Sequence, residues 1–192
     1  NTNLYSLIRC GTNSTFGEVI WYYPSANASS NDSYVKYNVN TQAWDYGTLD
    51  RTAWIDQSVL GSPIGAGTDN YIYQHEMGYD ADNQPMSSSF QTGYFALADG
   101  DEMVFVDQIW PDFKWGTYSG TQNANVNLTF YTADYPTDTP NVYGPYVLTN
   151  AVKYVTPRIR NRLISFKFSS NDAGTFWRIG NVRYRYAPDG RF

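Results

Sequence analysis

Glu18-Val-Ile-Trp-Tyr-Tyr-Pro24, a run of β-branched and aromatic residues ended by proline, decides the fold of the first part of the chain. Such residues favour a pleated, half-buried strand, and proline ends it. A polar loop from Ser25 to Ser33 follows, and then Tyr34-Val-Lys-Tyr-Asn-Val39 and Trp44-Asp-Tyr-Gly-Thr-Leu49 repeat the pattern. This order of strand, loop, strand, turn and strand predicts an antiparallel meander that resembles one blade of a β-propeller.

A second unit with a similar order of strands and loops begins near Ser62. Its strands are predicted at 63–69, 71–76 and 86–95, with a polar loop at 78–85. The repeat spacing of about 40 to 45 residues suits propeller blades. Since a propeller usually closes with about four to eight blades, we expect residues 1–98 to be the end of a larger propeller, with further blades upstream of Asn1.

The predicted strands become longer after Asp99-Gly-Asp101. Longer strands are predicted at 102–109, 124–132, 143–149, 158–168 and 176–186, separated by turns rich in Gly, Pro, Asn and Asp. Several antiparallel strands in one stretch of this length predict a jelly-roll-like β-sandwich over residues 99–192. The whole chain is therefore expected to be all-β.

The composition excludes several protein classes. Of 192 residues, 18% are aromatic and 16% charged, which excludes a disordered tail and a coiled coil. A single cysteine, Cys10, excludes an internal disulfide framework, and a single histidine, His75, leaves little room for a metal cluster. No apolar run approaches the length of about 18 residues that a membrane span needs. We expect no cofactor, no metal site and no membrane insertion by this chain.

The net charge of −5 conceals an asymmetry along the sequence. Residues 1–115 carry four basic and 14 acidic residues, a net of −10, whereas residues 116–192 carry nine basic and four acidic residues, a net of +5. A bias of this kind bears on the partners of a protein more than its total charge does. It suggests a chain that meets copies of itself or its neighbours.

The basic residues near the C-terminal end are the candidate contact residues. Arg158, Arg160 and Arg162 alternate with other residues along a predicted strand, so the period of two places them on one face, and Arg183 and Arg185 repeat the pattern. Such stripes suit either of two partners: carboxylates across a protein interface, or the phosphate backbone of DNA without regard to its sequence. With an acidic pI of about 4.7, the interface is favoured.

Residue patterns that suggest catalysis are weak. Asp80-Ala-Asp82 opens like a calcium loop but lacks the later Gly and Glu of that motif. His75 has no nucleophile motif beside it, and it is expected to be a packed or interface residue. Ser170-Asn-Asp-Ala-Gly-Thr-Phe-Trp177 matches the Asp-box of sialidases and other propellers, which predicts a hairpin closed by Asp172 and Gly174 with Trp177 packed beneath it. We expect no enzymatic activity.

Several segments together resemble one protein family. They are 47–56, 63–76, 99–101, 105–113, 143–146, 176–180 and 188–191. The resemblance is to the tail nozzle, or packaged-DNA stabilisation, proteins of short-tailed bacteriophages. It implies a β-propeller fused to a β-sandwich, arranged as a ring, usually a hexamer, in the virion tail below the portal and adaptor proteins. Such a ring extends the DNA exit channel, helps to retain and release the genome, and seats tail fibres or spikes; no catalytic residues are implied.

Two other hypotheses stay open. One is a carbohydrate-binding or glycan-cleaving propeller that recognises a receptor, in which side chains such as Trp110 and Trp115 stack on sugars and acidic residues carry acid–base chemistry. The other is direct, non-specific contact of Arg158, Arg160 and Arg162 with packaged DNA, which predicts binding that weakens with salt.

Overall fold

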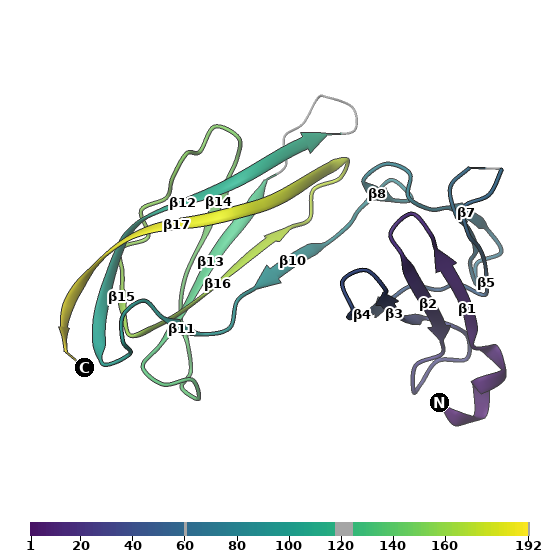
Figure 1. Ribbon diagram of the computed structural model, residues 1–192, viewed down its shortest axis with the longest axis horizontal. Helices are drawn as coiled ribbons and strands as arrows, with labels where there is room; N and C mark the ends of the chain where they lie inside the picture. The colour runs from purple at the N-terminus through teal and green to yellow at the C-terminus, as the bar shows by residue number, and fades with distance from the viewer. Residues whose placement is uncertain (60, 118–124, 192) are drawn as a thin grey trace. The chain divides into compact units, whose positions relative to one another are not determined.

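The computed structural model describes residues 1–59, 61–117 and 125–191, and it confirms an all-β fold of antiparallel sheets (Figure 1). The chain divides into two compact units, Asn1–Met77 and Gly78–Phe192. A short 3-10 helix, η1 (Thr2–Leu7), precedes the first strand. In the described part of the chain, no helix has the length and apolar character to cross a membrane.

The first unit opens with the predicted meander. Its strands are β1 (Arg9–Asn13), β2 (Glu18–Tyr23), β3 (Ser33–Asn38) and β4 (Ala43–Thr48), paired antiparallel in the order β1-β2-β3-β4. Along β2 the period of two buries Ile20 and Tyr22 on one face of the sheet. Sequence reasoning missed β1 because its Arg-Cys-Gly-Thr-Asn segment lacks the aromatic signal of the other three strands.

A second sheet lies against this buried face. It consists of β5 (Ala53–Ile55), β6 (Ile64–Ala66) and β7 (Ile72–Gln74), in the order β5-β6-β7. The Trp54 indole donates its Nε1–H to the carbonyl of Thr12 at 2.7 Å, and its ring centroid lies 5.7 Å from that of Tyr22. Trp54 covers Gly11 so closely that a Cβ there would overlap its ring. An aromatic side chain therefore joins the two sheets.

The second unit is the predicted β-sandwich. One sheet has the order β10-β16-β13-β14, with β11 also paired to β16, and the other has the order β15-β12-β17. The bounds of these strands, and of the separate β8–β9 hairpin, are β8 (Asp80–Ala81), β9 (Gln84–Pro85), β10 (Ser88–Gln91), β11 (Phe95–Ala96), β12 (Glu102–Thr117), β13 (Val126–Ala133), β14 (Asn141–Leu148), β15 (Ile159–Asn161), β16 (Leu163–Ser170) and β17 (Thr175–Arg191).

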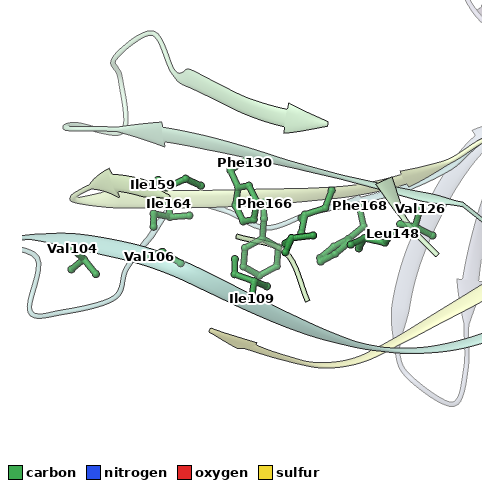
Figure 2. Packing of buried hydrophobic residues seen from close by; sticks show 12 residues of the cluster. Val104, Val106, Ile109, Val126, Phe130, Leu148, Ile159, Ile164, Phe166 and Phe168 are labelled. Atoms are coloured by element: carbon green, nitrogen blue, oxygen red, sulfur yellow. The ribbon is translucent and has the colours of Figure 1, made fainter. Parts of the chain in front are cut away.

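The core lies between these two sheets. Figure 2 shows Val104, Val106 and Ile109 of β12 facing the phenylalanines of β13 and β16. Phe168 is fully buried, and Phe113 lies edge-on to it with ring centroids 5.5 Å apart. Along β13, for example, Val126, Leu128 and Phe130 are buried in alternation, which is the pattern of a strand with one face in the core.

The boundary between the units lies earlier than the sequence suggested. Ser88 to Gln91 and Phe95 to Ala96 pair with β16, so residues 78–98 belong to the sandwich unit rather than to a second blade. The strand expected at 86–95 therefore does not extend the β5-β6-β7 sheet. Its pairing partner lies more than 70 residues further along the chain, a separation that local patterns do not reveal.

The strand expected at 158–168 is broken at Arg162. Ile159–Asn161 belongs to one sheet and Leu163–Ser170 to the other, so the chain crosses the sandwich between them. At the crossing, the side-chain oxygen of Asn161 accepts the backbone N–H of Arg162 at 2.6 Å, and its Nδ2 donates to Oγ1 of the buried Thr132 at 3.1 Å. These bonds replace the ladder bonds that a continuous strand would have made.

The Asp-box prediction of a hairpin is wrong. β16 and β17 flank the motif but lie in different sheets, so residues 171–174 form an arch that connects the two layers. Gly174 adopts a φ of 66°, and Asp172 Oδ2 accepts the backbone N–H of Asn125 at 2.7 Å. Trp177 does pack against the core, with its ring 5.9 Å from that of Phe113.

Candidate functional site

Three of the five candidate arginines, Arg160, Arg183 and Arg185, lie on the outer face of the β15-β12-β17 sheet. Ile159 of β15 belongs to the core, so the next residue, Arg160, lies on the opposite face. On β17, Val182 packs against the core and Tyr184 lines its small cavity, which places Arg183 and Arg185 on the outer face as well. The period of two correctly predicted that Arg183 and Arg185 share a face of β17, whereas of Arg158, Arg160 and Arg162 only Arg160 lies within β15.

Two of these arginines form ion pairs with carboxylates of the same chain. Arg160 Nε lies 2.5 Å from Asp189 Oδ2, and its Nη2 donates to the carbonyl of Asp189 at 2.8 Å. Arg183 Nη2 lies 2.6 Å from Asp112 Oδ2. Both pairs are substantially exposed, so each contributes little to stability.

A third pair joins Arg185 to Asp107. The guanidinium donates through Nε and Nη2 to both carboxylate oxygens. Asp107 occupies a β-bulge in β12, between Val106 and Gln108, which turns its side chain toward β17. Hydrogen bonding to Arg185, with a smaller effect from the nearby Arg158, lowers the pKa of the Asp107 carboxyl, and the same hydrogen bond raises the pKa of Arg185.

Arg162 has a different role from the one its spacing suggested. Its Nη1 donates to the carbonyl of Asp134 at 3.1 Å, its Nε donates to the carbonyl of Gly100, and its guanidinium lies 5.3 Å from the Tyr135 ring centroid. These contacts hold the corner where the chain changes sheets. Arg162 is therefore not aligned with Arg158 and Arg160 as a single stripe.

Arg158 lies beside an open hollow of about 630 Å³, which we call the Arg158 hollow; its lining residues are Phe105, Asp107, Thr156, Arg158 and Arg185. Arg158 adopts a φ of 52°, in the left-handed region that residues other than glycine rarely occupy. The segment before it is fixed to β12, because Val155 and Ile109 exchange two backbone hydrogen bonds of 3.0 Å. The hollow brings together two of the five candidate arginines.

The opposite charges of the two halves of the sequence meet within the fold. Asp107 and Asp112 of β12 come from the acidic half, and Arg183 and Arg185 of β17 come from the basic half. The antiparallel pairing of these two strands places them in contact. The asymmetry therefore reflects, in part, which strands pair inside one chain. Lys114 and Arg178 are an exception to this pairing of opposite charges, because two positive side chains lie directly opposite each other on β12 and β17. The sequence alone did not reveal this pair.

The first unit contains a buried polar cluster around Arg51. Its Nε donates to Nε2 of His75 at 2.9 Å, and its guanidinium lies 4.4 Å from the Tyr73 ring centroid. Burial, reinforced by the positive charge of Arg51, lowers the pKa of His75 to about 4. The imidazole is thus neutral at physiological pH and acts as a hydrogen-bond acceptor. His75 is packed, as its isolated position in the sequence led us to expect.

The other face of the β1–β4 sheet is aromatic. Trp21 and Trp44 stack with ring centroids 6.0 Å apart, and Tyr37 lies 4.8 Å from Trp44. Trp44 is 65% exposed and Tyr46 is 81% exposed. In contrast, Trp115 packs against the core of the sandwich, and Trp110 lies 6.4 Å from Tyr154. The exposed aromatic side chains suited to ligand contact therefore include residues that the sequence did not single out.

Comparisons with known proteins leave the family open: no family model matches the chain, and a search of curated proteins finds no match. Among residues 1–59, 61–117 and 125–191, no three His, Cys, Asp or Glu side chains gather as a metal site. The geometry of the ion pairs, the Arg158 hollow and the aromatic face is thus the basis on which a function is proposed.

Proposed function

We propose that the chain is a structural protein of a bacteriophage virion, forming part of the tail nozzle ring below the portal and adaptor proteins. The observation that carries the proposal is the order of architectures along the chain. A blade-like four-stranded meander with a second sheet stacked on it precedes an antiparallel sandwich. This is the order that the resemblance to nozzle proteins implies.

The proposed role is mechanical and electrostatic. Copies of the chain form a ring, usually a hexamer in the family it resembles, and the hydrogen-bonded sheets make the wall stiff. Residues 1–77 carry seven acidic and three basic side chains, so a lumen lined by this unit would repel DNA and let it slide. Fibres or spikes would attach to the outside. No step of this role needs a catalytic group or a cofactor.

The arginine geometry bears on how such a ring would contact DNA. Arg160, Arg183 and Arg185 already bind carboxylates, which cancels much of the attraction for a phosphate backbone. These pairs weaken the attraction for external carboxylates as well, so the preference for a protein interface over direct DNA contact rests on the acidic pI of about 4.7. If duplex DNA were retained in a salt-dependent way and lost on replacing Arg158 and Arg160, this preference would be reversed.

Oligomeric state provides the test of the nozzle proposal. We expect native mass spectrometry of the chain to detect a closed ring, and electron microscopy to reveal one with a central channel. Antibodies against the chain should label the tail end of intact virions that contain it. Monomers alone at the high local concentrations of a virion, together with no labelling of particles, would contradict the proposal.

A second candidate function is glycan binding, which the exposed aromatic face of the β1–β4 sheet favours. Aromatic rings provide apolar surfaces on which sugars stack. A glycan array, followed by the Trp44→Ala variant, tests this function, and Tyr71→Ala is a matched control because Tyr71 is 68% exposed outside that face. Binding lost only in Trp44→Ala would support a receptor-binding protein, whereas no binding to any glycan would exclude this candidate.

A further inference from the structure

The Arg158 hollow combines features of a small anion-binding site. Arg158 and Arg185 contribute two positive charges to its lining and Asp107 contributes one negative charge, which leaves a single positive charge. Thr156 adds a hydroxyl group, and Phe105 adds an apolar surface. A ligand that suits this lining has one negative charge, oxygen acceptors and an apolar portion.

The two arginines differ in how far their donors are used. Arg185 directs Nε and Nη2 at Asp107, which fixes its orientation in the lining. Arg158 is close enough to Asp107 to affect its carboxyl, yet the ion pair there is formed by Arg185. The planar guanidinium of Arg158 is thus the group best suited to receive a second oxyanion, in the forked geometry that arginine favours.

The backbone holds Arg158 in place. Val155, Pro157 and Ile159 are buried in alternation, so Thr156 and Arg158 are both directed outward. The left-handed φ of Arg158 persists between a segment anchored to Ile109 and the first residue of β15. A left-handed conformation kept at an arginine rather than at glycine or asparagine points to a use for its side chain.

We propose that the Arg158 hollow binds a single carboxylate group, held by Arg158 and Thr156, with its aliphatic part resting on Phe105. A carboxylate matches the one net positive charge of the lining, whereas a phosphate dianion leaves excess negative charge next to Asp107. The carboxylate belongs either to a small organic acid or to an acidic side chain of a second copy of the chain. The second source rests on the contact between copies that the nozzle proposal assumes, whereas binding of a small organic acid does not.

NMR titration of the arginine Nε–H signals with sodium butyrate tests the site. We expect the Arg158 signal to shift saturably, with tighter binding of butyrate than of acetate because of the contact with Phe105. Inorganic phosphate should bind more weakly than butyrate. The absence of a saturable shift, or phosphate binding at least as tight as butyrate, would overturn the proposal.

Two variants separate binding from folding. Arg158→Asn should weaken butyrate binding at least about tenfold while stability is kept or raised, since asparagine tolerates a left-handed backbone. Arg183→Gln removes the same charge from strand β17 but lies outside the hollow, and it should leave binding unchanged. Equal losses in the two variants would mean that general charge attraction, rather than this site, accounts for the shifts.

Sedimentation of the wild-type chain distinguishes the two sources of the carboxylate. If the chain associates, and if butyrate and Arg158→Asn each abolish that association, the carboxylate comes from an acidic side chain of a second copy. Butyrate binding by a chain whose sedimentation does not change identifies a small organic acid. Both results support the site. The site is ruled out if neither butyrate nor Arg158→Asn changes the association and the chain gives no NMR shift.

Discussion

Arg185 and Asp107 form a forked ion pair, with Nε 2.8 Å from Oδ1 and Nη2 2.5 Å from Oδ2, that joins β17 to the bulge of β12. The bulge matters because it adds a residue to β12 and turns the carboxylate toward its partner strand. The pair shows why arginines identified by spacing alone need not face an external partner.

This pair predicts a pH-dependent effect of Asp107→Asn. The pKa of Asp107 is lowered in the folded chain, so its stabilising contribution is present at neutral pH and is lost as the pH falls below about 4. The stability difference between wild type and Asp107→Asn, measured by urea denaturation, should therefore be constant near pH 7 and shrink in acid. A difference that grows in acid would contradict the assignment.

His75 predicts an acid-sensitive first unit. Its pKa of about 4 lies below the unfolded value of 6.5, so the unfolded state binds more protons between these pH values. Stability should fall as the pH drops from 7 to 4, by about 1–2 kcal/mol once solvent screening of the partly exposed ring is considered. His75→Gln, which keeps an acceptor for Arg51, should flatten this part of the pH profile; an unchanged profile would exclude His75 as its cause.

Gly11 predicts a packing effect between two sheets. A Cβ at this position would overlap the Trp54 ring, so Gly11→Ala should lower the free energy of unfolding by about 1–3 kcal/mol. Gly93→Ala is the control, because a Cβ at Gly93 meets no atom within 4 Å. Denaturation followed by tryptophan fluorescence measures both, and equal stability of the two variants would rule out close contact at Gly11.

Arg162 predicts a structural cost at the crossing between sheets. Its guanidinium donates to two backbone carbonyls, so Arg162→Ala should destabilise the sandwich by about 2 kcal/mol. Arg183→Gln removes an exposed ion pair and should cost at most about 1 kcal/mol. Thermal denaturation that ranks the two variants in the reverse order would return Arg162 to the group of contact residues.

Among these variants, truncation of Phe168 is expected to cause the largest loss of folding stability. This side chain is fully buried between Phe113 and Phe166, so Phe168→Ala should lower the free energy of unfolding by about 3–5 kcal/mol. Its cross-strand neighbour Phe90 is 47% exposed, and Phe90→Ala should cost about 1 kcal/mol. Similar losses in the two variants, measured by chemical denaturation, would contradict the position of the core.

Local patterns predicted the strands better than their partners. The aromatic runs that contain Trp21 and Tyr37 identified two neighbouring strands of the first sheet, since alternation and turns are properties of short segments. The pairing of Phe90 with Phe168 was not predictable in this way, because it depends on two segments far apart in the chain. The boundary expected after residue 98 was misplaced for the same reason.

For the candidate site, too, local spacing was predictable from the sequence and the tertiary partners were not. Spacing correctly placed Arg183 and Arg185 on one face of β17, but it could not reveal that Asp112 and Asp107 lie beside them. The break at Arg162 was hidden because the alternation of buried and exposed residues continues through it, although the chain changes sheets there. Arg158 was identified by sequence, whereas the hollow beside it is a product of tertiary structure.

The long pairing of β12 with β17 has a consequence for the order of folding. β12 ends at Thr117, and the strand that pairs with it begins at Thr175. The pairing of β12 with β17 therefore cannot form until the residues between them have been synthesised. The first unit makes its pairings within residues 1–77 and can fold sooner during synthesis. Until residues 175–191 emerge from the ribosome, β12 exposes an apolar face and an open edge, which is the interval in which this chain is most vulnerable to aggregation.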